Sequence, residues 1–173
     1  MTQPKPTFET VIKDHAKLLS RVASTYEAND SIQQELFQEI CVAIWQALRA
    51  YKGDASIKTF ILKVAHNRCV THVGKEANRF KSHAHEDAAS LADQALINSQ
   101  ESLESDFVYS QQLVRLLQSI RNLKLPARQV ISLSLEGLSY DEIAQICGMS
   151  VSNVGVIINR VKEQLRKEIS DER

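Results

Sequence analysis

Residues 139–154 read SYDEIAQICGMSVSNV, and this stretch decides the architecture of the C-terminal part of the chain. Two short helices can cross at a steep angle only where the crossing residue is small and the turn can adopt a positive φ. Ala144 meets the first condition and Gly148 meets the second, while Ser150 can cap the second helix. Apolar residues fall where they would fill the wedge between the helices: Ile143, Cys147, Met149, Val154 and Ile157. An ordinary αα-hairpin needs no such fixed set, so the pattern predicts a DNA-binding helix-turn-helix.

The composition is that of a globular protein. A chain of 173 residues is long enough for one ordinary domain or two small ones. No apolar run approaches the ~18 residues of a membrane span, and the first seven residues include two prolines and lead into no apolar segment. We therefore expect neither membrane insertion nor a secretory signal. The three cysteines are odd in number and far apart, which indicates free thiols in a reducing cytoplasm.

The net charge of zero conceals a strong division along the chain. Residues 49–81 carry eight basic and two acidic residues, whereas residues 82–112 carry six acidic residues and no lysine or arginine. Affinity for phosphates depends on the local patch rather than on the sum over the chain. The charge pattern is therefore compatible with nucleic-acid binding, and it predicts that the acidic segment covers the basic block in the free protein.

Helical periodicity covers three segments of the first half. Residues 8–26 carry an apolar stripe, and Asn29 can cap the next helix, expected at about 32–50. Ser56 can cap a third helix at about 57–75, so these helices can form a small bundle with its own core. The second helix has a broad apolar face made of Leu36, Phe37, Ile40, Cys41, Ile44, Trp45 and Leu48.

The remainder of the chain predicts a tether and a second helical unit. Residues 79–106 are rich in small, polar and acidic side chains, which is typical of a flexible linker. Periodicity returns at 107–123, and Pro126 opens the helix that precedes the helix-turn-helix. The prediction is an all-α fold of two small helical domains, at 1–78 and 107–173, joined by a flexible acidic linker.

Two groups of residues in the first half match a known pattern. The first group is Glu35-Leu36-Phe37-Gln38-Glu39, followed by Trp45. The second group is Tyr51-Lys52-Gly53-Asp54-Ala55-Ser56-Ile57-Lys58-Thr59-Phe60-Ile61, then Val64-Ala65-His66-Asn67-Arg68. With the helix-turn-helix behind them, they resemble bacterial sigma-70-family factors, specifically the two-domain extracytoplasmic-function group. The resemblance covers about residues 8–78 and 107–168.

The resemblance implies contacts with core RNA polymerase, on its β′ clamp helices and its β flap. In the family the second helix docks on the clamp helices, and a polar face suits that contact here: Glu35, Gln38, Glu39 and Gln46. Without the resemblance, the same side chains would be interpreted as a solvated helix face.

The resemblance also implies that the turn and the start of the third helix bind the minus-ten promoter element. A base that leaves the stack needs a pocket, hydrogen-bond partners and nearby cations. The candidates are Tyr51, Lys52, Gly53, Ser56, Lys58, Lys63, Asn67 and Arg68. Phe60 stands where the family usually has Trp, and a core role is the favoured interpretation for its ring.

The helix that begins near Val151 is then expected in the major groove of the minus-thirty-five element. Its candidates are Ser152, Asn153, Gly155, Val156, Asn159 and Arg160. The family often carries Lys or Arg at the places of Gly155 and Ile157, so Arg160 is the main basic contact that remains. Base readout through the amides or through a contact between Val156 and a thymine methyl group stays open.

Other chemistries have weaker support. His66, Cys69 and His72 are spaced by three and could bind a metal, but this spacing drifts around a helix and no fourth ligand is evident. No catalytic triad, phosphate loop or carboxylate pair is visible, so we expect neither an enzyme nor a cofactor.

The sequence thus predicts an alternative sigma factor that acts in the cytoplasm with core RNA polymerase and promoter DNA. An anti-sigma factor is a further partner that the resemblance allows. The first alternative is a free-standing helix-turn-helix regulator, which has no need of a cationic, base-accepting turn. The second alternative is a protein-interaction module such as an anti-sigma factor, which needs no second DNA-facing domain.

Overall fold

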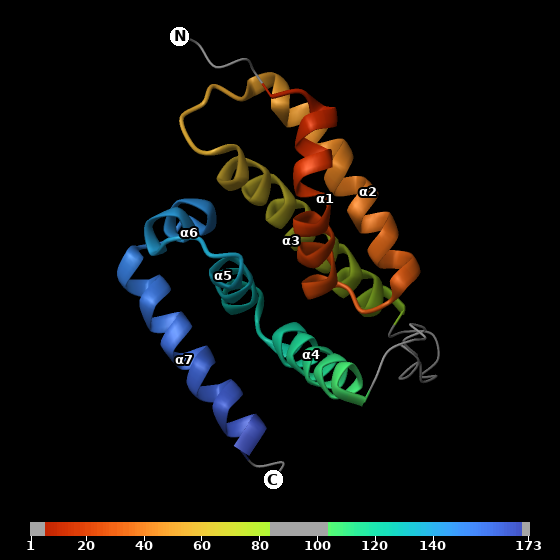
Figure 1. Cartoon of the computed structure of the whole chain (residues 1–173), viewed down its shortest axis with the longest axis vertical. Helices are drawn as coiled ribbons and strands as arrows, with labels where there is room; N and C mark the ends of the chain where they lie inside the picture. The colour runs from red at the N-terminus through yellow and green to blue at the C-terminus, as the bar shows by residue number, and fades with distance from the viewer. Residues whose placement is uncertain (1–5, 84–103, 171–173) are drawn as a thin grey trace.

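The computed structural model describes residues 6–83 and 104–170, and these ranges contain helices and no strands. Figure 1 shows two groups of helices, α1 to α3 and α4 to α7, that follow each other along the chain. The predicted all-α class with two helical units is confirmed.

The first group is close to the sequence prediction. Its elements are α1 (Phe8–Tyr26), α2 (Asp30–Ala47), a short 3-10 turn η1 (Leu48–Ala50) and α3 (Ile57–His83). Asn29 caps α2, because its side chain accepts hydrogen bonds from the backbone N–H groups of Ser31 and Ile32. Ser56 likewise accepts from the N–H of Thr59 at the start of α3. The third helix continues to residue 83 rather than ending near residue 75.

The second group contains the helix-turn-helix. Its elements are α4 (Glu104–Asn122), α5 (Leu125–Leu135), α6 (Tyr140–Cys147) and α7 (Val151–Ser170). Pro126 occupies the first turn of α5, as its missing N–H permits. Gly148 ends α6 with φ +66°, which L side chains rarely adopt, so the predicted turn between α6 and α7 is confirmed.

The predicted linker at 79–106 falls largely outside the described residues. Residues 79–83 belong to α3 and residues 104–106 belong to α4, while 84–103 lie outside the description. Most of the acidic segment that we expected to cover the basic block also lies outside the described residues. In the described residues, one contact of the basic block is made by the turn between α5 and α6 instead.

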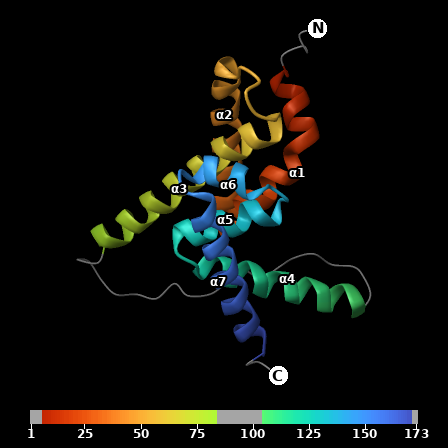
Figure 2. The ribbon, with the colours of Figure 1, turned by 90° about the vertical axis from the view of Figure 1, so that its left-hand side faces the viewer.

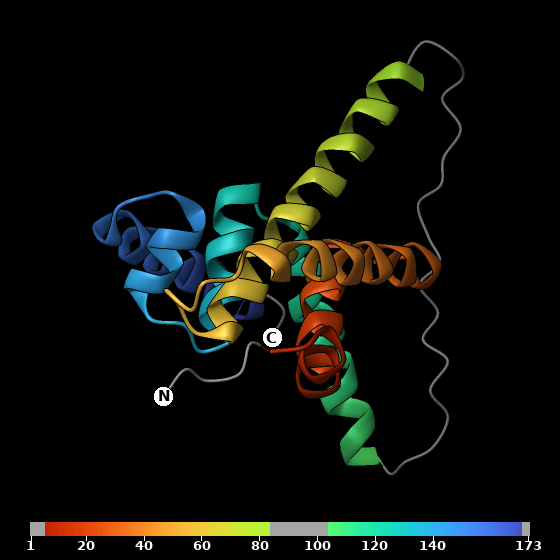
Figure 3. The ribbon, with the colours of Figure 1, turned by 90° about the horizontal axis from the view of Figure 1, so that it is seen from above.

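The two helical groups share a core, which the sequence did not predict. One continuous cluster of buried apolar side chains includes Leu19 of α1, Ile40 of α2 and Ile61 of α3, and it continues into Leu133 of α5 and Ile143 of α6. A smaller cluster joins α4, α5 and α7 through Ile120, Leu123, Ile131 and Val161. Figures 2 and 3 show α5 and α6 beside α3, in agreement with their contacts. The core of the first three helices therefore continues into α5 and α6.

Candidate nucleic-acid interface

The recognition unit is held together by a capping box at the start of α6. The Ser139 hydroxyl accepts from the N–H of Glu142 at 3.3 Å, and the Glu142 carboxylate accepts from the N–H of Ser139 at 2.9 Å. Hydrogen bonds from Ser139 and Thr59 lower the pKa of the Glu142 carboxyl group. Ile143 and Val154 are fully buried between the helices, which fixes the angle at which α7 is presented.

The residues predicted to read the minus-thirty-five element lie on the exposed side of α7. Five of the six candidates are exposed: Ser152, Asn153, Val156, Asn159 and Arg160. Val154, Ile158 and Val161 on the opposite side are buried. The alternation follows from the helical period, and it leaves polar and cationic groups at the N-terminal half of α7, where a recognition helix contacts base edges.

Gly155 differs from the other candidates because another side chain covers it. A Cβ atom placed on Gly155 would lie 3.5 Å from Cε2 of Tyr140, the first residue of α6. Tyr140 remains 42% exposed, so its ring borders the exposed face of α7. Sequence reasoning missed Tyr140. The sequence signal that could have indicated such a neighbour is Gly155 itself, because a glycine inside a helix is not required by a turn and leaves room for a neighbouring ring.

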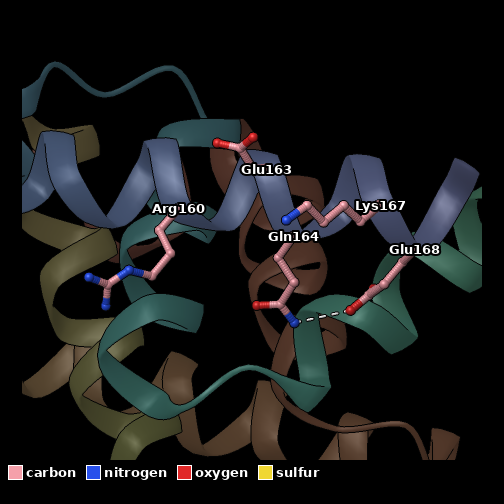
Figure 4. Close-up of a pocket in the computed structure, with 5 residues that line it drawn as sticks. All are labelled: Arg160, Glu163, Gln164, Lys167 and Glu168. Atoms are coloured by element: carbon pink, nitrogen blue, oxygen red, sulfur yellow. Dashed lines mark hydrogen bonds between the residues drawn. The ribbon is translucent and has the colours of Figure 1, made fainter.

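The C-terminal half of α7 carries both signs of charge. Figure 4 shows Arg160, Glu163, Gln164, Lys167 and Glu168 around a shallow pocket of about 510 Å³. Gln164 donates a hydrogen bond to Glu168 at 3.0 Å. The carboxylates offset the cations in this stretch, so the attraction for phosphates is concentrated toward Arg160.

The basic turn between η1 and α3 forms a second concave surface. The Tyr51 hydroxyl donates to the carbonyl O of Ala55 at 2.7 Å, and its ring lies 4.9 Å from that of Phe60. Gly53 has φ +87°, which permits this tight turn. A pocket of about 350 Å³ opens beside the turn, lined by Ala50, Tyr51, Lys52, Asp54, Ala55, Thr59, Phe60, Lys63, Gln145 and Ile146. An aromatic wall with two lysines suits a stacked base and its phosphates.

The predicted minus-ten residues differ in their availability. Lys52, Gly53, Ser56, Lys63 and Asn67 are exposed, while Tyr51, Lys58 and Arg68 are half-buried. Lys63 and Asn67 are one helical turn apart, so they share a face of α3.

Besides Tyr51, three of these side chains already have partners within the protein. The Ser56 hydroxyl caps α3. The Lys58 ammonium donates to the carbonyl O of Glu136 at 2.6 Å. Arg68 lies 3.9 Å from a carboxylate oxygen of Glu39 on α2, in a partly exposed ion pair.

The predicted polymerase-binding residues share one surface of α2. Glu35, Gln38, Glu39 and Gln46 are all exposed. Two large apolar side chains lie among them, Val42 at 51% exposure and Trp45 at 47%. The guanidinium of Arg49 lies 4.9 Å from the centroid of the Trp45 ring. The sequence placed Trp45 on the apolar face, whereas the structure exposes half of it. Exposed apolar groups within a polar rim are typical of a protein-docking surface.

The three residues considered for a metal site have other roles. His66 is fully buried, and its Nδ1 atom lies 2.7 Å from the Tyr26 hydroxyl. His72 contacts Glu27 at 3.0 Å. Burial lowers the pKa of His66 to about 3 and raises the pKa of the Cys69 thiol to about 12. Among the described residues, no group of three His, Cys, Asp or Glu side chains is arranged to hold a metal. None of the described helices is long and apolar enough to span a bilayer.

Comparisons with known proteins agree with this geometry. The family model described as Sigma-70 region 2 matches residues 11–79, and the model described as Sigma-70, region 4 matches residues 113–165. The RNA polymerase sigma factor NccH of Alcaligenes xylosoxydans xylosoxydans is 22% identical over 91% of this chain and 84% of its own length. The ECF RNA polymerase sigma-E factor of Haemophilus influenzae is 21% identical over 95% of this chain and 88% of its own length.

Solved structures share the fold. The sigma factor RpoE of Bartonella quintana, crystallised with the anti-sigma factor NepR, has a TM-score of 0.70 at 17% identity and covers 96% of this chain and 98% of its own. CnrH, in complex with the cytosolic domain of CnrY, has a TM-score of 0.66 at 18% identity and covers 96% of this chain and 89% of its own. The two family models occupy, in the same order, the two helical groups that carry the basic turn and the recognition helix. The chain belongs to the sigma-70 family of RNA polymerase sigma factors, in its extracytoplasmic-function group.

Proposed function

We propose that this chain acts as an alternative sigma factor, which binds core RNA polymerase and directs it to a defined set of promoters. The observation that carries the proposal is the ordered pair of sigma regions, each with its predicted contact residues mostly exposed. A sigma factor positions the polymerase on DNA and performs no chemical step of its own. The proposal therefore includes no catalytic residue and no cofactor, and it places the protein in the cytoplasm, where transcription occurs.

The exposed surface of α2 is the proposed contact with the polymerase clamp. Glu35, Gln38, Glu39 and Gln46 would provide direction through hydrogen bonds and charge, and Trp45 and Val42 would provide apolar area. Aromatic residues surrounded by polar groups are enriched among the residues that dominate binding energies, which supports this assignment.

The two DNA contacts are proposed on different elements. Tyr51, Lys52 and Lys63 at the pocket beside the turn, with Asn67 on the next turn of α3, would bind an unstacked base and flanking phosphates of the minus-ten element. The exposed side of α7 would enter the major groove of the minus-thirty-five element, with Arg160 as its cation. An anti-sigma partner is also proposed, because the similar structure of the sigma factor RpoE is a complex with the anti-sigma factor NepR.

Run-off transcription tests this function directly. Purified chain and purified core polymerase are incubated with genomic fragments of the source bacterium, and the 5′ ends of the transcripts are mapped. We expect a discrete set of start sites that core polymerase alone does not use. A protein that binds specific duplexes without core polymerase and adds no start site would instead be a free-standing regulator.

A further inference from the structure

The outward face of α7 has an apolar side chain at its centre. Val156 lies two positions from Val154 and two positions from Ile158, and both of these residues are fully buried. Since an α-helix turns by ~100° per residue, two positions carry a side chain to about the opposite side of the helix. Val156 therefore points away from the core, and 53% of it is exposed.

Polar side chains surround Val156 on this face. One helical turn away on either side lie four exposed residues: Ser152, Asn153, Asn159 and Arg160. A recognition helix contacts base edges with the outward side of its N-terminal half. A single exposed valine elsewhere on the surface would need no explanation, but this one lies where the helix comes closest to the bases.

The flank beside Val156 is covered by an aromatic ring rather than by a cation. Gly155 lies under Tyr140, whose Cε2 atom is 3.5 Å from the position of an added Cβ. The Tyr140 ring therefore lies where a side chain at position 155 would begin. Residues 151–159 contain no Lys, Arg, Asp or Glu. The first half of α7 thus offers apolar and amide groups to DNA, with one cation at its end, Arg160.

The chemistry of the major groove decides which base pair such a surface can distinguish. Guanine is read by Arg or Lys, which donate to its O6 and N7 atoms, and cytosine is read by Asp or Glu, which accept from its N4 amino group. Val156 can do neither. Against a G·C pair its methyl groups would displace water from polar atoms and return no hydrogen bond, which is unfavourable. Thymine instead presents a 5-methyl group, which matches the valine.

We propose that Val156 reads a thymine methyl group, so that the minus-thirty-five element of this protein has an A·T pair at the centre of the α7 contact. The inference rests on the proposed function and adds the class of base pair that α7 selects. Asn159, one turn further along the same face, suits this choice, because an asparagine amide pairs with the N6 and N7 atoms of adenine. Arg160 is left for a guanine or a phosphate at the end of the contact.

The test removes the methyl group from the DNA and the valine from the protein. Deoxyuridine in place of thymidine lacks only the 5-methyl group and pairs with adenine unchanged. Each thymidine of the minus-thirty-five element, on both strands of a promoter found by run-off transcription, is replaced in turn. The holoenzyme of the full-length chain and core polymerase is titrated against each fluorescein-labelled duplex, and binding is measured by anisotropy.

Two variants complete the comparison. Val156→Ala removes the proposed contact, and it should fold, because the site is exposed and alanine has the higher helix propensity. Val151→Ala is the matched control. Val151 is 41% exposed on the same helix, but it precedes the buried Val154 by three positions and so lies toward the core side.

We expect one deoxyuridine position to weaken wild-type binding about three- to sixfold, the effect of removing one methyl group from an apolar contact. Val156→Ala should bind the natural promoter more weakly by a similar factor and should no longer respond to deoxyuridine at that position. Val151→Ala should keep the wild-type response. The two losses are then not additive, which identifies a direct contact between the methyl group and the side chain.

Three results would overturn the methyl contact: no response at any deoxyuridine position, an equal response in wild type and Val156→Ala, or loss of the response in Val151→Ala alone. Discrete start sites in the run-off assay together with any of these would leave the proposed function intact. If the run-off assay gives no start site, the proposed function fails, and the full-length chain alone is used to select duplexes from a random pool. A deoxyuridine response that Val156→Ala abolishes on those duplexes would still support the contact, and its absence there would overturn it.

Discussion

At the scale of single residues, the absence of a side chain at Gly155 shapes the surface of α7. Its missing side chain leaves the flank of α7 open to the Tyr140 ring. Arg160 is the one basic residue in the N-terminal half of α7, at 151–160, so we expect it to supply much of the attraction for DNA there.

Gly155→Ala should stabilise the protein by about 0.5–1 kcal/mol, because alanine loses less backbone entropy in a helix and its Cβ fits beside Tyr140. Urea unfolding measures the change. Gly74→Ala in α3 is the matched control, since nothing lies within 4 Å of its added Cβ. If Gly155→Ala lowered the stability and Gly74→Ala did not, the Tyr140 ring would be unable to accommodate the added methyl group.

Arg160→Ala should weaken binding to a minus-thirty-five duplex by about 1–3 kcal/mol, the usual value of a good contact to a base edge. Anisotropy with a duplex taken from the run-off promoters measures it. Lys167→Ala, farther along the same helix, removes the same charge and should cost less. Full binding in Arg160→Ala, with loss in Asn153→Ala or Asn159→Ala, would assign the readout to the amides.

His66 connects a residue-scale property to stability. Burial lowers its pKa to about 3, against an ordinary value of 6.5. Below pH 6.5 His66 becomes protonated in the unfolded chain, whereas in the folded chain it stays neutral down to about pH 3. The free energy of unfolding should therefore decrease as the pH falls through this window, by up to ~1.4 kcal/mol per unit.

Urea unfolding from pH 7 down to pH 4 checks this slope. His66→Gln retains a hydrogen-bond partner for Tyr26 and cannot titrate, so its stability should depend less on pH, whatever its absolute value. His15→Gln on α1 serves as the control. Equal slopes in wild type and His66→Gln would show that another group dominates the acid sensitivity.

At the scale of elements, α2 and α3 present two different kinds of surface. One side of α2 is buried through Leu36, Ile40 and Ile44 and holds the fold, while the other side presents Trp45 within a polar rim. The start of α3 and its preceding turn present cations and a pocket. The only recorded ion pair between these two surfaces, within the described residues, is that of Arg68 and Glu39.

Glu39→Lys should weaken binding to core polymerase at least about fivefold, since a rim charge steers and orients a partner. Its pair with Arg68 is partly exposed and long, so the fold should persist. Pull-down with labelled core measures binding, and circular dichroism measures folding. Asp14→Lys on the exposed side of α1 controls for the change in net charge. Undiminished core binding would remove α2 from the interface.

Lys52→Ala and Asn67→Ala should affect different terms of minus-ten recognition. Loss of the Lys52 charge should weaken all promoters and reduce the slope of affinity against salt by about one unit, whereas loss of the Asn67 amide should change which base is accepted. Permanganate footprinting and a salt titration with the polymerase holoenzyme separate the two. Equal and sequence-independent losses would make Asn67 a structural residue.

At the scale of the whole molecule, the two helical groups act as one body in the free chain. Their shared apolar cluster and the contacts of Arg21, Arg121 and Lys58 join parts of the chain that are 78 to 115 residues apart. Each sigma region therefore contributes to the stability of the other.

The sequence alone determined the elements and their local chemistry. Caps at Asn29, Ser56 and Ser150, the positive φ of Gly148 and the helical stripes depend on neighbours within about four residues, so their patterns could be recognised along the chain. The exposed sides of α2 and α7 follow from the same periodicity, which is why most of the candidate contact residues could be named before their positions were known.

Only the tertiary structure decided how these elements meet. The exposure of Trp45, the Tyr140 ring on Gly155, and the pairing of Lys58 with Glu136 depend on residues distant in sequence, and no local period encodes them. The shared core has the same origin, because an apolar stripe specifies that a face will be buried but not which partner covers it. The sequence therefore determined which side chains each helix offers to its surroundings, and the packing of α4 to α6 on α1 and α3 decided which of them remain exposed.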